Sequence, residues 1–85
     1  MTTKQVTIYT TKTCPHCNRA KMLFNSKGLE YIEINVDDSS DREMMISKAN
    51  GRRTVPQIFI GDVHVGGADD LYNLESENKL DQMLS

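Results

Sequence analysis

Two cysteines, Cys14 and Cys17, stand two residues apart in the segment Thr13-Cys14-Pro15-His16-Cys17, and the chain of 85 residues contains no others. The segment follows a strand-like run and precedes a helix-like run, so Cys14 falls at the first turn of a helix. Unpaired N–H groups and aligned peptide dipoles at that turn favour a thiolate over a thiol. We therefore expect Cys14 to be a nucleophile and Cys17, one turn further on, to resolve any mixed disulfide that it forms.

Length and composition limit the chain to one small domain, which we expect to span residues 1–85. Hydrophobic residues make up 38% of the sequence and charged residues 26%, a balance typical of ordinary globular proteins. The formal net charge of −2 gives no electrostatic reason to bind nucleic acid or an anionic membrane. Because no apolar run approaches the ~20 residues of a membrane span and no signal segment is evident, we expect a cytoplasmic protein.

The sequence gives less support to two other roles for the cysteines, a structural disulfide and a zinc site. Structural disulfides are rare in a reducing compartment, and a bridge that closes so short a loop constrains the unfolded chain little. Zinc prefers four tetrahedral ligands, whereas this chain offers one Cys-x-x-Cys pair, His64 and the poorly placed His16. A catalytic pair is the better explanation, and we expect no bound metal.

Hydrophobic periodicity predicts alternating strands and helices. Strands are expected over Val6–Thr10, Tyr31–Val36, Gln57–Ile60 and Val63–Val65. Helices are expected from Pro15 to a stop at Gly28, from a capping box at Ser40 and Glu43 to Asn50, from a cap at Asp69 through Leu74, and around Leu80–Leu84. The first strand–helix–strand unit implies parallel pairing, and Gly61-Asp62 favours an antiparallel hairpin. The expected fold is α/β, in the order βαβαββα with a tail helix and a mixed four-stranded sheet flanked by helices.

Three blocks at these separations resemble the glutaredoxins, particularly the small bacterial kind with two active-site cysteines. The blocks are Lys12–Cys17, Arg53–Pro56 and Gly66–Asp69. The resemblance spans nearly the whole chain and implies a thioredoxin fold. It also implies a glutathione-dependent thiol-disulfide oxidoreductase that reduces protein–glutathione mixed disulfides and protein disulfides. Glutathione is then a reducing substrate, and no bound cofactor is expected.

The second block contains a proline, Pro56, whose preceding peptide bond could be cis. Pro56 stands at the start of a strand, where a proline cannot donate to the sheet, and an X-Pro bond adopts the cis form more readily than other peptide bonds. In the family this bond is cis and faces the active cysteine, which implies that Val55 pairs through its backbone with the cysteinyl unit of glutathione. Thr54 and Pro56 belong to the same expected site. A trans proline that merely opens an edge strand is the alternative.

Charged and glycine-rich positions supply the rest of the expected glutathione site. Glutathione carries two carboxylates and one ammonium group, so its site needs cations at one end and an acceptor with backbone donors at the other. The resemblance assigns Lys12 and Arg53 to the glycyl carboxylate. It assigns the N–H groups of Gly67 and Ala68 to the γ-glutamyl carboxylate, and Asp69 to the ammonium group. Taken singly, each charge is more often a solvated surface residue, and Asp69 can serve only as a helix cap.

His16 is the main departure from the family, which often has tyrosine or phenylalanine between the proline and the second cysteine. An imidazolium here would stabilise the Cys14 thiolate, lower the pKa of that thiol and make the disulfide more oxidising. A solvated histidine in the turn is the alternative. We place His16 among the expected glutathione contacts.

The resemblance also implies partners. Glutathionylated or disulfide-containing proteins, with ribonucleotide reductase among them, are the expected clients, and glutathione reductase with NADPH lies upstream. We expect a monomer without nucleic acid or membrane partners. Two rival functions use the same cysteines: a thioredoxin-like reductant recharged by a flavoprotein reductase, and a dimeric carrier of an iron–sulfur cluster held by Cys14 and glutathione. Relatives that carry clusters usually have glycine or serine in the dipeptide, where this chain has the stiffer Pro15.

Overall fold

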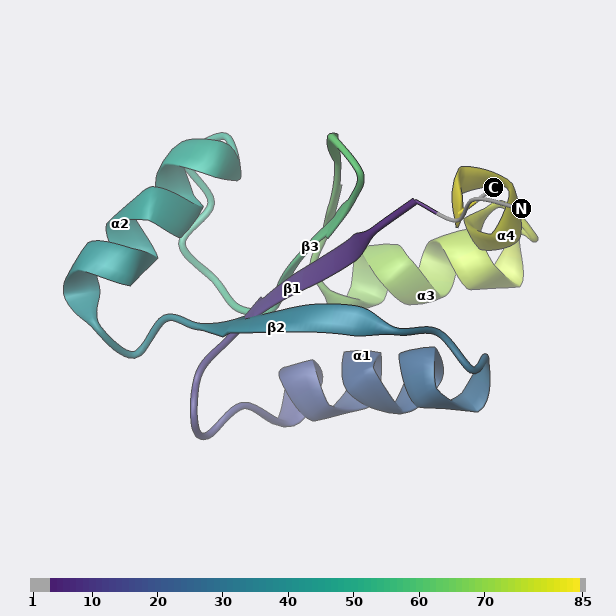
Figure 1. Ribbon diagram of the computed structural model, residues 1–85, viewed down its shortest axis with the longest axis horizontal. Helices are drawn as coiled ribbons and strands as arrows, with labels where there is room; N and C mark the ends of the chain where they lie inside the picture. The colour runs from purple at the N-terminus through teal and green to yellow at the C-terminus, as the bar shows by residue number, and fades with distance from the viewer. Residues whose placement is uncertain (1–3, 85) are drawn as a thin grey trace.

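Four strands form one mixed sheet in the computed structural model, which describes residues 4–84 (Figure 1). They are β1 (Val6–Thr10), β2 (Tyr31–Asn35), β3 (Gln57–Ile60) and β4 (Val63–Gly66). Their order across the sheet is β2-β1-β3-β4; β1 runs parallel to β2 and antiparallel to β3, and β4 is antiparallel to β3. The predicted α/β order and the mixed four-stranded sheet are confirmed.

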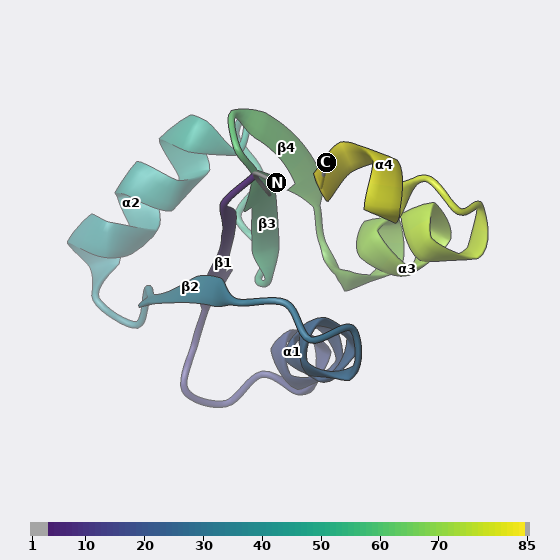
Figure 2. The same cartoon turned by 45° about the vertical axis from the view of Figure 1, so that its right-hand side comes forward.

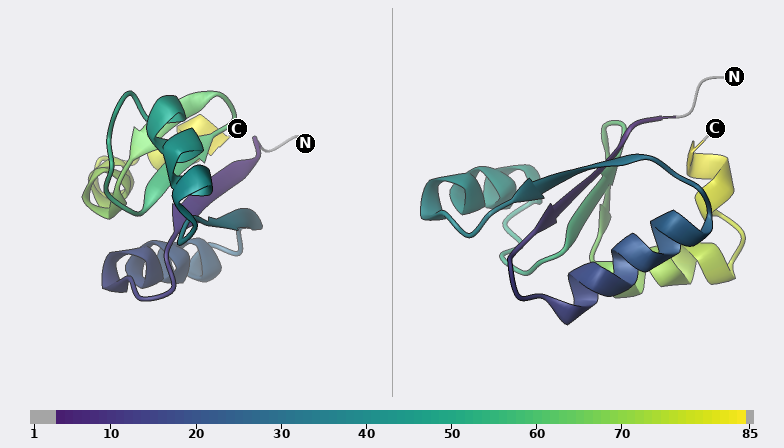
Figure 3. Two further views of the ribbon diagram at one scale, coloured as in Figure 1. Left: turned by 90° about the vertical axis from the view of Figure 1, so that its left-hand side faces the viewer. Right: turned by 60° about the horizontal axis from the view of Figure 1, so that its bottom comes forward.

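Helices cover both faces of this sheet. They are α1 (Pro15–Ser26), α2 (Ser39–Lys48), α3 (Ala68–Ser76) and α4 (Leu80–Leu84). Figures 2 and 3 show α1, α3 and α4 gathered together, with α2 standing apart from them across the sheet. None of these four described helices is long and apolar enough to cross a membrane.

Helix α1 has the boundaries that its sequence predicts. Pro15 occupies the first turn, where its missing N–H group costs nothing. Gly28 follows the last turn with a φ of 69°, a left-handed conformation that glycine adopts without steric penalty. The N–H group of Leu29 donates to the carbonyl of Phe24 at 2.9 Å and completes this helix end.

The predicted starts of the second and third helices are wrong by two residues, because the observed caps are Asp38 and Gly67 instead of Ser40 and Asp69. Asp38 caps α2, because its carboxylate accepts from both the N–H group of Ser40 at 2.8 Å and the Ser40 hydroxyl at 2.9 Å. Ser40 thus lies inside the helix as a donor. At α3 the predicted cap, Asp69, is already helical, and Asp70 closes the helix start by accepting from the N–H group of Gly67 at 2.9 Å.

Two apolar clusters, one on each face of the sheet, hold the layers together. The larger cluster lies between the sheet and helices α1, α3 and α4, and its fully buried centre includes Phe24, whose ring centroid is 5.3 Å from that of Tyr31. The smaller cluster joins α2 to the sheet through Met45, Val36 and Tyr9. The α1 face therefore supplies most of the apolar burial.

The Phe24→Ala variant should test this assignment. Removing a fully buried ring leaves a cavity, so the free energy of unfolding should fall by about 3–5 kcal/mol. Met22 lies on the same helix but is 67% exposed, so Met22→Ala should change the free energy by less than about 0.5 kcal/mol. Urea unfolding of both variants measures the difference, and equal losses would place the core elsewhere.

Candidate active site

Cys14 and Cys17 lie just beyond the carboxyl end of β1 and are joined by a disulfide. Cys14 is the N-cap of α1, and its sulfur accepts from the N–H group of Cys17 at 3.1 Å. Cys14 is 8% exposed and Cys17 is 1% exposed. In the reduced pair, a thiolate at Cys14 would face a backbone donor at the positive end of the helix, whereas Cys17 is shielded behind it. This arrangement makes Cys14 the cysteine that a substrate meets first.

The loop before β3 lies against the Cys14 sulfur. The Val55-Pro56 peptide bond is cis, as the resemblance implies. The carbonyl oxygen of Val55 lies 3.7 Å from the sulfur of Cys14, although the two residues are 41 positions apart in the sequence. The backbone of Val55 therefore lies directly beside the position at which a group attached to that sulfur begins.

A groove of about 160 Å³ opens at this loop and is formed by segments distant in sequence. It is lined by His16, Arg52, Thr54, Val55, Pro56, Gly67, Ala68, Asp69 and Asp70. The N-terminal turn of α1, the loop before β3 and the first turn of α3 therefore meet beside the Cys14 sulfur. Most of the residues that the sequence predicts for glutathione belong to this lining.

Lys12 and Arg53 were also predicted for the site but do not line the groove. The backbone N–H group of Lys12 donates to the carboxylate of Asp37 at 3.1 Å, which anchors the loop before Cys14. The carbonyl of Arg53 accepts from the guanidinium of Arg42 at 3.0 Å. Both side chains are exposed, and their roles toward a ligand stay predictions.

The lining of the groove includes an ion pair between Arg52 and Asp70, which sequence reasoning missed. Their charged atoms lie 3.1 Å apart. The hydrogen bond from the Gly67 N–H group, followed by that from Arg52, holds the pKa of Asp70 below its usual range. A Cβ atom at Gly66, where φ is 117°, would collide with both charged groups, so the turn requires glycine there. The spacing from Gly67 to Asp70 is that of a capping box and is the signal that could have revealed Asp70.

Arg19, a cation that contacts two lining residues, was also missed by sequence reasoning. It lies on α1, three residues after His16, and the two side-chain nitrogens are 3.4 Å apart. Its guanidinium is 3.8 Å from the carboxylate of Asp69 and 5.1 Å from the ring centre of Tyr72. The Asp69 side chain is nevertheless 86% exposed, so its carboxylate remains accessible to a ligand at the rim of the groove.

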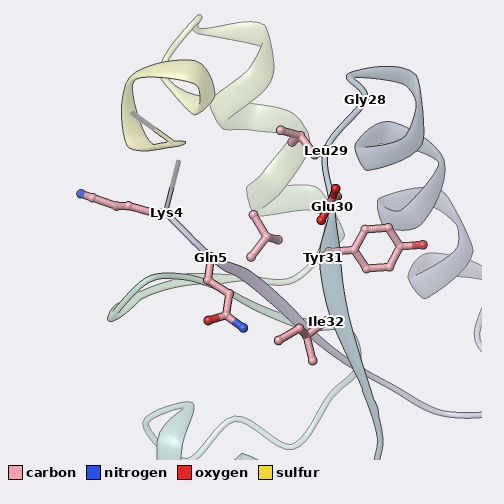
Figure 4. Close-up of a pocket in the computed structure, with 8 residues that line it drawn as sticks. Lys4, Gln5, Gly28, Leu29, Glu30, Tyr31 and Ile32 are labelled. Atoms are coloured by element: carbon pink, nitrogen blue, oxygen red, sulfur yellow. The ribbon is translucent and has the colours of Figure 1, made fainter. Parts of the chain in front are cut away.

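A larger cavity, of about 570 Å³, lies at the opposite end of the sheet (Figure 4). It is lined by Lys4, Gln5, Val6, Gly28, Leu29, Glu30, Tyr31 and Ile32. These residues come from the start of β1 and from the connection between α1 and β2, and no cysteine is among them. We therefore place the chemistry at the smaller groove. Among residues 4–84, no cluster of three or more histidine, cysteine, aspartate or glutamate side chains is arranged to hold a metal ion.

Comparison with known proteins agrees with this arrangement. The family model for glutaredoxins matches residues 6–65. Glutaredoxin 3 of Escherichia coli K12 is 48% identical over 79 residues, which cover 93% of this chain and 95% of the relative. The solution structure of glutaredoxin from Brucella melitensis matches with a TM-score of 0.86 at 50% identity, covering 99% of this chain and 91% of that one. A buckwheat glutaredoxin–glutathione complex matches with a TM-score of 0.85 at 33% identity, covering 95% and 76%.

We predict that the thiol of Cys14 ionises at lower pH than that of Cys17. In the Cys17→Ser variant, the single remaining thiol should have a pKa below about 7.5, against about 8.5 for an ordinary cysteine, because the helix N-terminus stabilises its thiolate. In Cys14→Ser the remaining thiol is buried, and its pKa should be at or above about 8.5. Ultraviolet titration of thiolate absorbance measures both. An ordinary pKa in Cys17→Ser would contradict this assignment.

The lowered pKa of Asp70 predicts a pH-dependent contribution to stability. Its ionised form is favoured in the folded state, so the contribution is present above the unfolded pKa of about 3.9 and is lost as the pH falls toward the lower folded value. Because Asp70 is partly exposed, Asp70→Ala should cost only about 1 kcal/mol at neutral pH.

Urea unfolding at neutral pH and near pH 3 tests this prediction. The difference between wild type and Asp70→Ala should shrink at the lower pH. Asp69→Ala, a change at the exposed neighbour, should cost less than about 0.5 kcal/mol at either pH. A difference for Asp70→Ala that does not depend on pH would show that the carboxylate contributes through packing alone.

Proposed function

This chain belongs to the glutaredoxin family, and we propose that it uses glutathione to reduce protein–glutathione mixed disulfides and protein disulfides. Membership of the family makes it a thiol-disulfide oxidoreductase. The observation that carries the glutathione-specific proposal is the sulfur of Cys14 at the start of α1, 3.7 Å from the Val55 carbonyl and beside a groove with an accessible acidic rim.

Reduction of a mixed disulfide needs only Cys14. Its thiolate attacks the glutathione sulfur, the bond between glutathione and the client breaks, and the client leaves as a thiolate that takes a proton from solvent. Glutathione is then bonded to Cys14. A second glutathione thiolate attacks the bound glutathione sulfur, which releases oxidised glutathione and restores the Cys14 thiolate.

Reduction of a protein disulfide uses both cysteines. Cys14 attacks one client sulfur and forms a mixed disulfide with the client, and Cys17 then attacks Cys14 and releases the reduced client. The product is the Cys14–Cys17 bridge, which is the state of the described structure. Two glutathione molecules reduce this bridge in turn. In this bridged state the Cα atoms of the pair are 5.2 Å apart, within the usual range for a disulfide.

The groove suits the shape and charge of glutathione. The Val55 backbone would pair with the cysteinyl unit, and the N–H groups of Gly67 and Ala68 would face the γ-glutamyl carboxylate, with Asp69 accepting from the ammonium group. Lys12 and Arg53 would serve the glycyl carboxylate from outside the described lining. The buckwheat relative, solved with glutathione, supports this class of ligand.

The cellular setting that we propose follows from the same reaction. Glutathione reductase and NADPH would regenerate glutathione, and glutathionylated or disulfide-containing proteins, ribonucleotide reductase among them, would be the clients. The protein would act as a cytoplasmic monomer.

A glutathione-coupled assay with a glutathionylated peptide tests the proposal. Wild type and Cys17→Ser should both be active, because the mixed-disulfide route does not use Cys17, whereas Cys14→Ser should lose activity by at least about 1,000-fold with its nucleophile. With a protein disulfide as substrate, Cys17→Ser should also fail. Comparable losses in both single variants on the glutathionylated peptide would exclude the single-cysteine route. Recharging of wild type by a flavoprotein reductase, with no response to glutathione, would favour a thioredoxin-like function.

A further inference from the structure

A buried amide side chain stands behind the loop that faces Cys14. Gln57, the first residue of β3, is fully buried. Its amide nitrogen donates to the carbonyl of Thr54 at 2.9 Å and lies 3.2 Å from the Thr54 hydroxyl. Its amide oxygen lies 2.7 Å from the Nε2 atom of His64. Both ends of the amide are therefore hydrogen-bonded, one to the loop before β3 and the other to β4.

The donors and acceptors in this chain of contacts have only one consistent arrangement. A backbone carbonyl can only accept, so the NH₂ group of Gln57 must face Thr54 and the amide oxygen must face His64. His64 must then donate from Nε2. Burial, with the charge of Arg52 as a smaller cause, lowers the pKa of His64, so near neutral pH its ring carries a single proton, which this contact assigns to Nε2.

We propose that His64 is a positioning residue for glutathione, which acts through Gln57 on the Thr54–Val55 backbone. This inference rests on the proposed function and names a determinant of its substrate site. His64 is not among the residues that line the groove, so any effect on a ligand there must pass through other residues. Its effect passes through the amide of Gln57 to the carbonyl of Thr54, one residue before the backbone that faces Cys14.

The role that we assign to His64 is to hold the amide of Gln57 in place by donating to its oxygen. Without a donor at Nε2, the buried oxygen of Gln57 loses its partner, and an unpaired buried polar atom is unfavourable. Rotation of the amide by half a turn offers no relief, because it would place that oxygen against the carbonyl of Thr54, where two acceptors repel each other. The Gln57 side chain would instead shift to pair its oxygen elsewhere, which weakens its hydrogen bond to Thr54 and leaves the Val55 backbone less firmly positioned.

Packing is the competing explanation for His64. Its ring stacks on Phe59 with centroids 4.8 Å apart and an interplanar angle of 26°. The His64→Phe variant separates the two roles, because it keeps an aromatic ring for stacking and removes the donor to Gln57. His64→Gln does the reverse: it removes the ring and keeps an N–H donor on a side chain of similar reach.

Kinetics with the glutathionylated peptide test the proposal. His64→Phe should raise KM about 3- to 10-fold, the size of one lost hydrogen bond, and leave kcat within about 2-fold. His64→Gln should stay within about 2-fold of the wild-type KM. Gln57→Met removes the amide but nearly keeps the shape of the side chain, and it should raise KM at least as much as His64→Phe does. The double variant that carries both Gln57→Met and His64→Phe should have the same KM as Gln57→Met alone.

Amide shifts from ¹H–¹⁵N spectra test the same contacts without any activity. The signals of Thr54 and Val55 should move in His64→Phe relative to wild type, and adding His64→Phe to Gln57→Met should move them no further. Additive effects in the double variant, or a wild-type KM and unchanged loop shifts in His64→Phe, would overturn the proposal. An inactive wild type would instead refute the proposed function, and the spectra would still decide the role of His64.

Discussion

The hydrogen bond from the Cys17 N–H group to the Cys14 sulfur is the contact on which the rest of the site depends. At most helix starts an oxygen of serine, threonine, aspartate or asparagine fills this position. Here the capping atom is also the proposed nucleophile, so the geometry that begins α1 is the geometry that would stabilise its thiolate. Pro15 sets the first turn of the helix, and the burial of Phe24 holds the helix against the sheet. The core of the protein therefore fixes the direction in which the sulfur points.

Sheet topology brings the remaining groups to that sulfur. Strands β1 and β3 are antiparallel neighbours with Tyr9 opposite Gln57, so the carboxyl end of β1 lies beside the start of β3. The loop that carries Cys14 thus meets the Thr54–Pro56 loop. Strand β4 returns along β3 and leads directly into α3, so the turn at Gly67 arrives at the same end of the sheet. Segments more than fifty residues apart in sequence converge because the two central strands run in opposite directions.

The sequence predicts features that depend on local periodicity and misses those that depend on side chains meeting across elements. The bounds of β1 and β3 and the stop at Gly28 follow from alternation and from backbone preference, and the structure confirms them. The predicted helix starts are wrong where several neighbouring polar residues could each serve as the N-cap, as Asp38 and Ser40 could. The spacing of Gly67 and Asp70 indicates a helix cap, but spacing alone shows neither that Asp70 pairs with Arg52 nor that Gln57 contacts His64. Both contacts depend on β4 returning beside β3 and leading into α3.

The central claim is that the sulfur of Cys14 alone accepts glutathione directly from a client. Intact-mass analysis and peptide mapping of the Cys17→Ser variant, after one equivalent of a glutathionylated protein, test this claim most directly. The predicted result is glutathione on Cys14 and a client with a free thiol. Attachment of the client to Cys14 with release of glutathione, or the absence of any adduct, would contradict it.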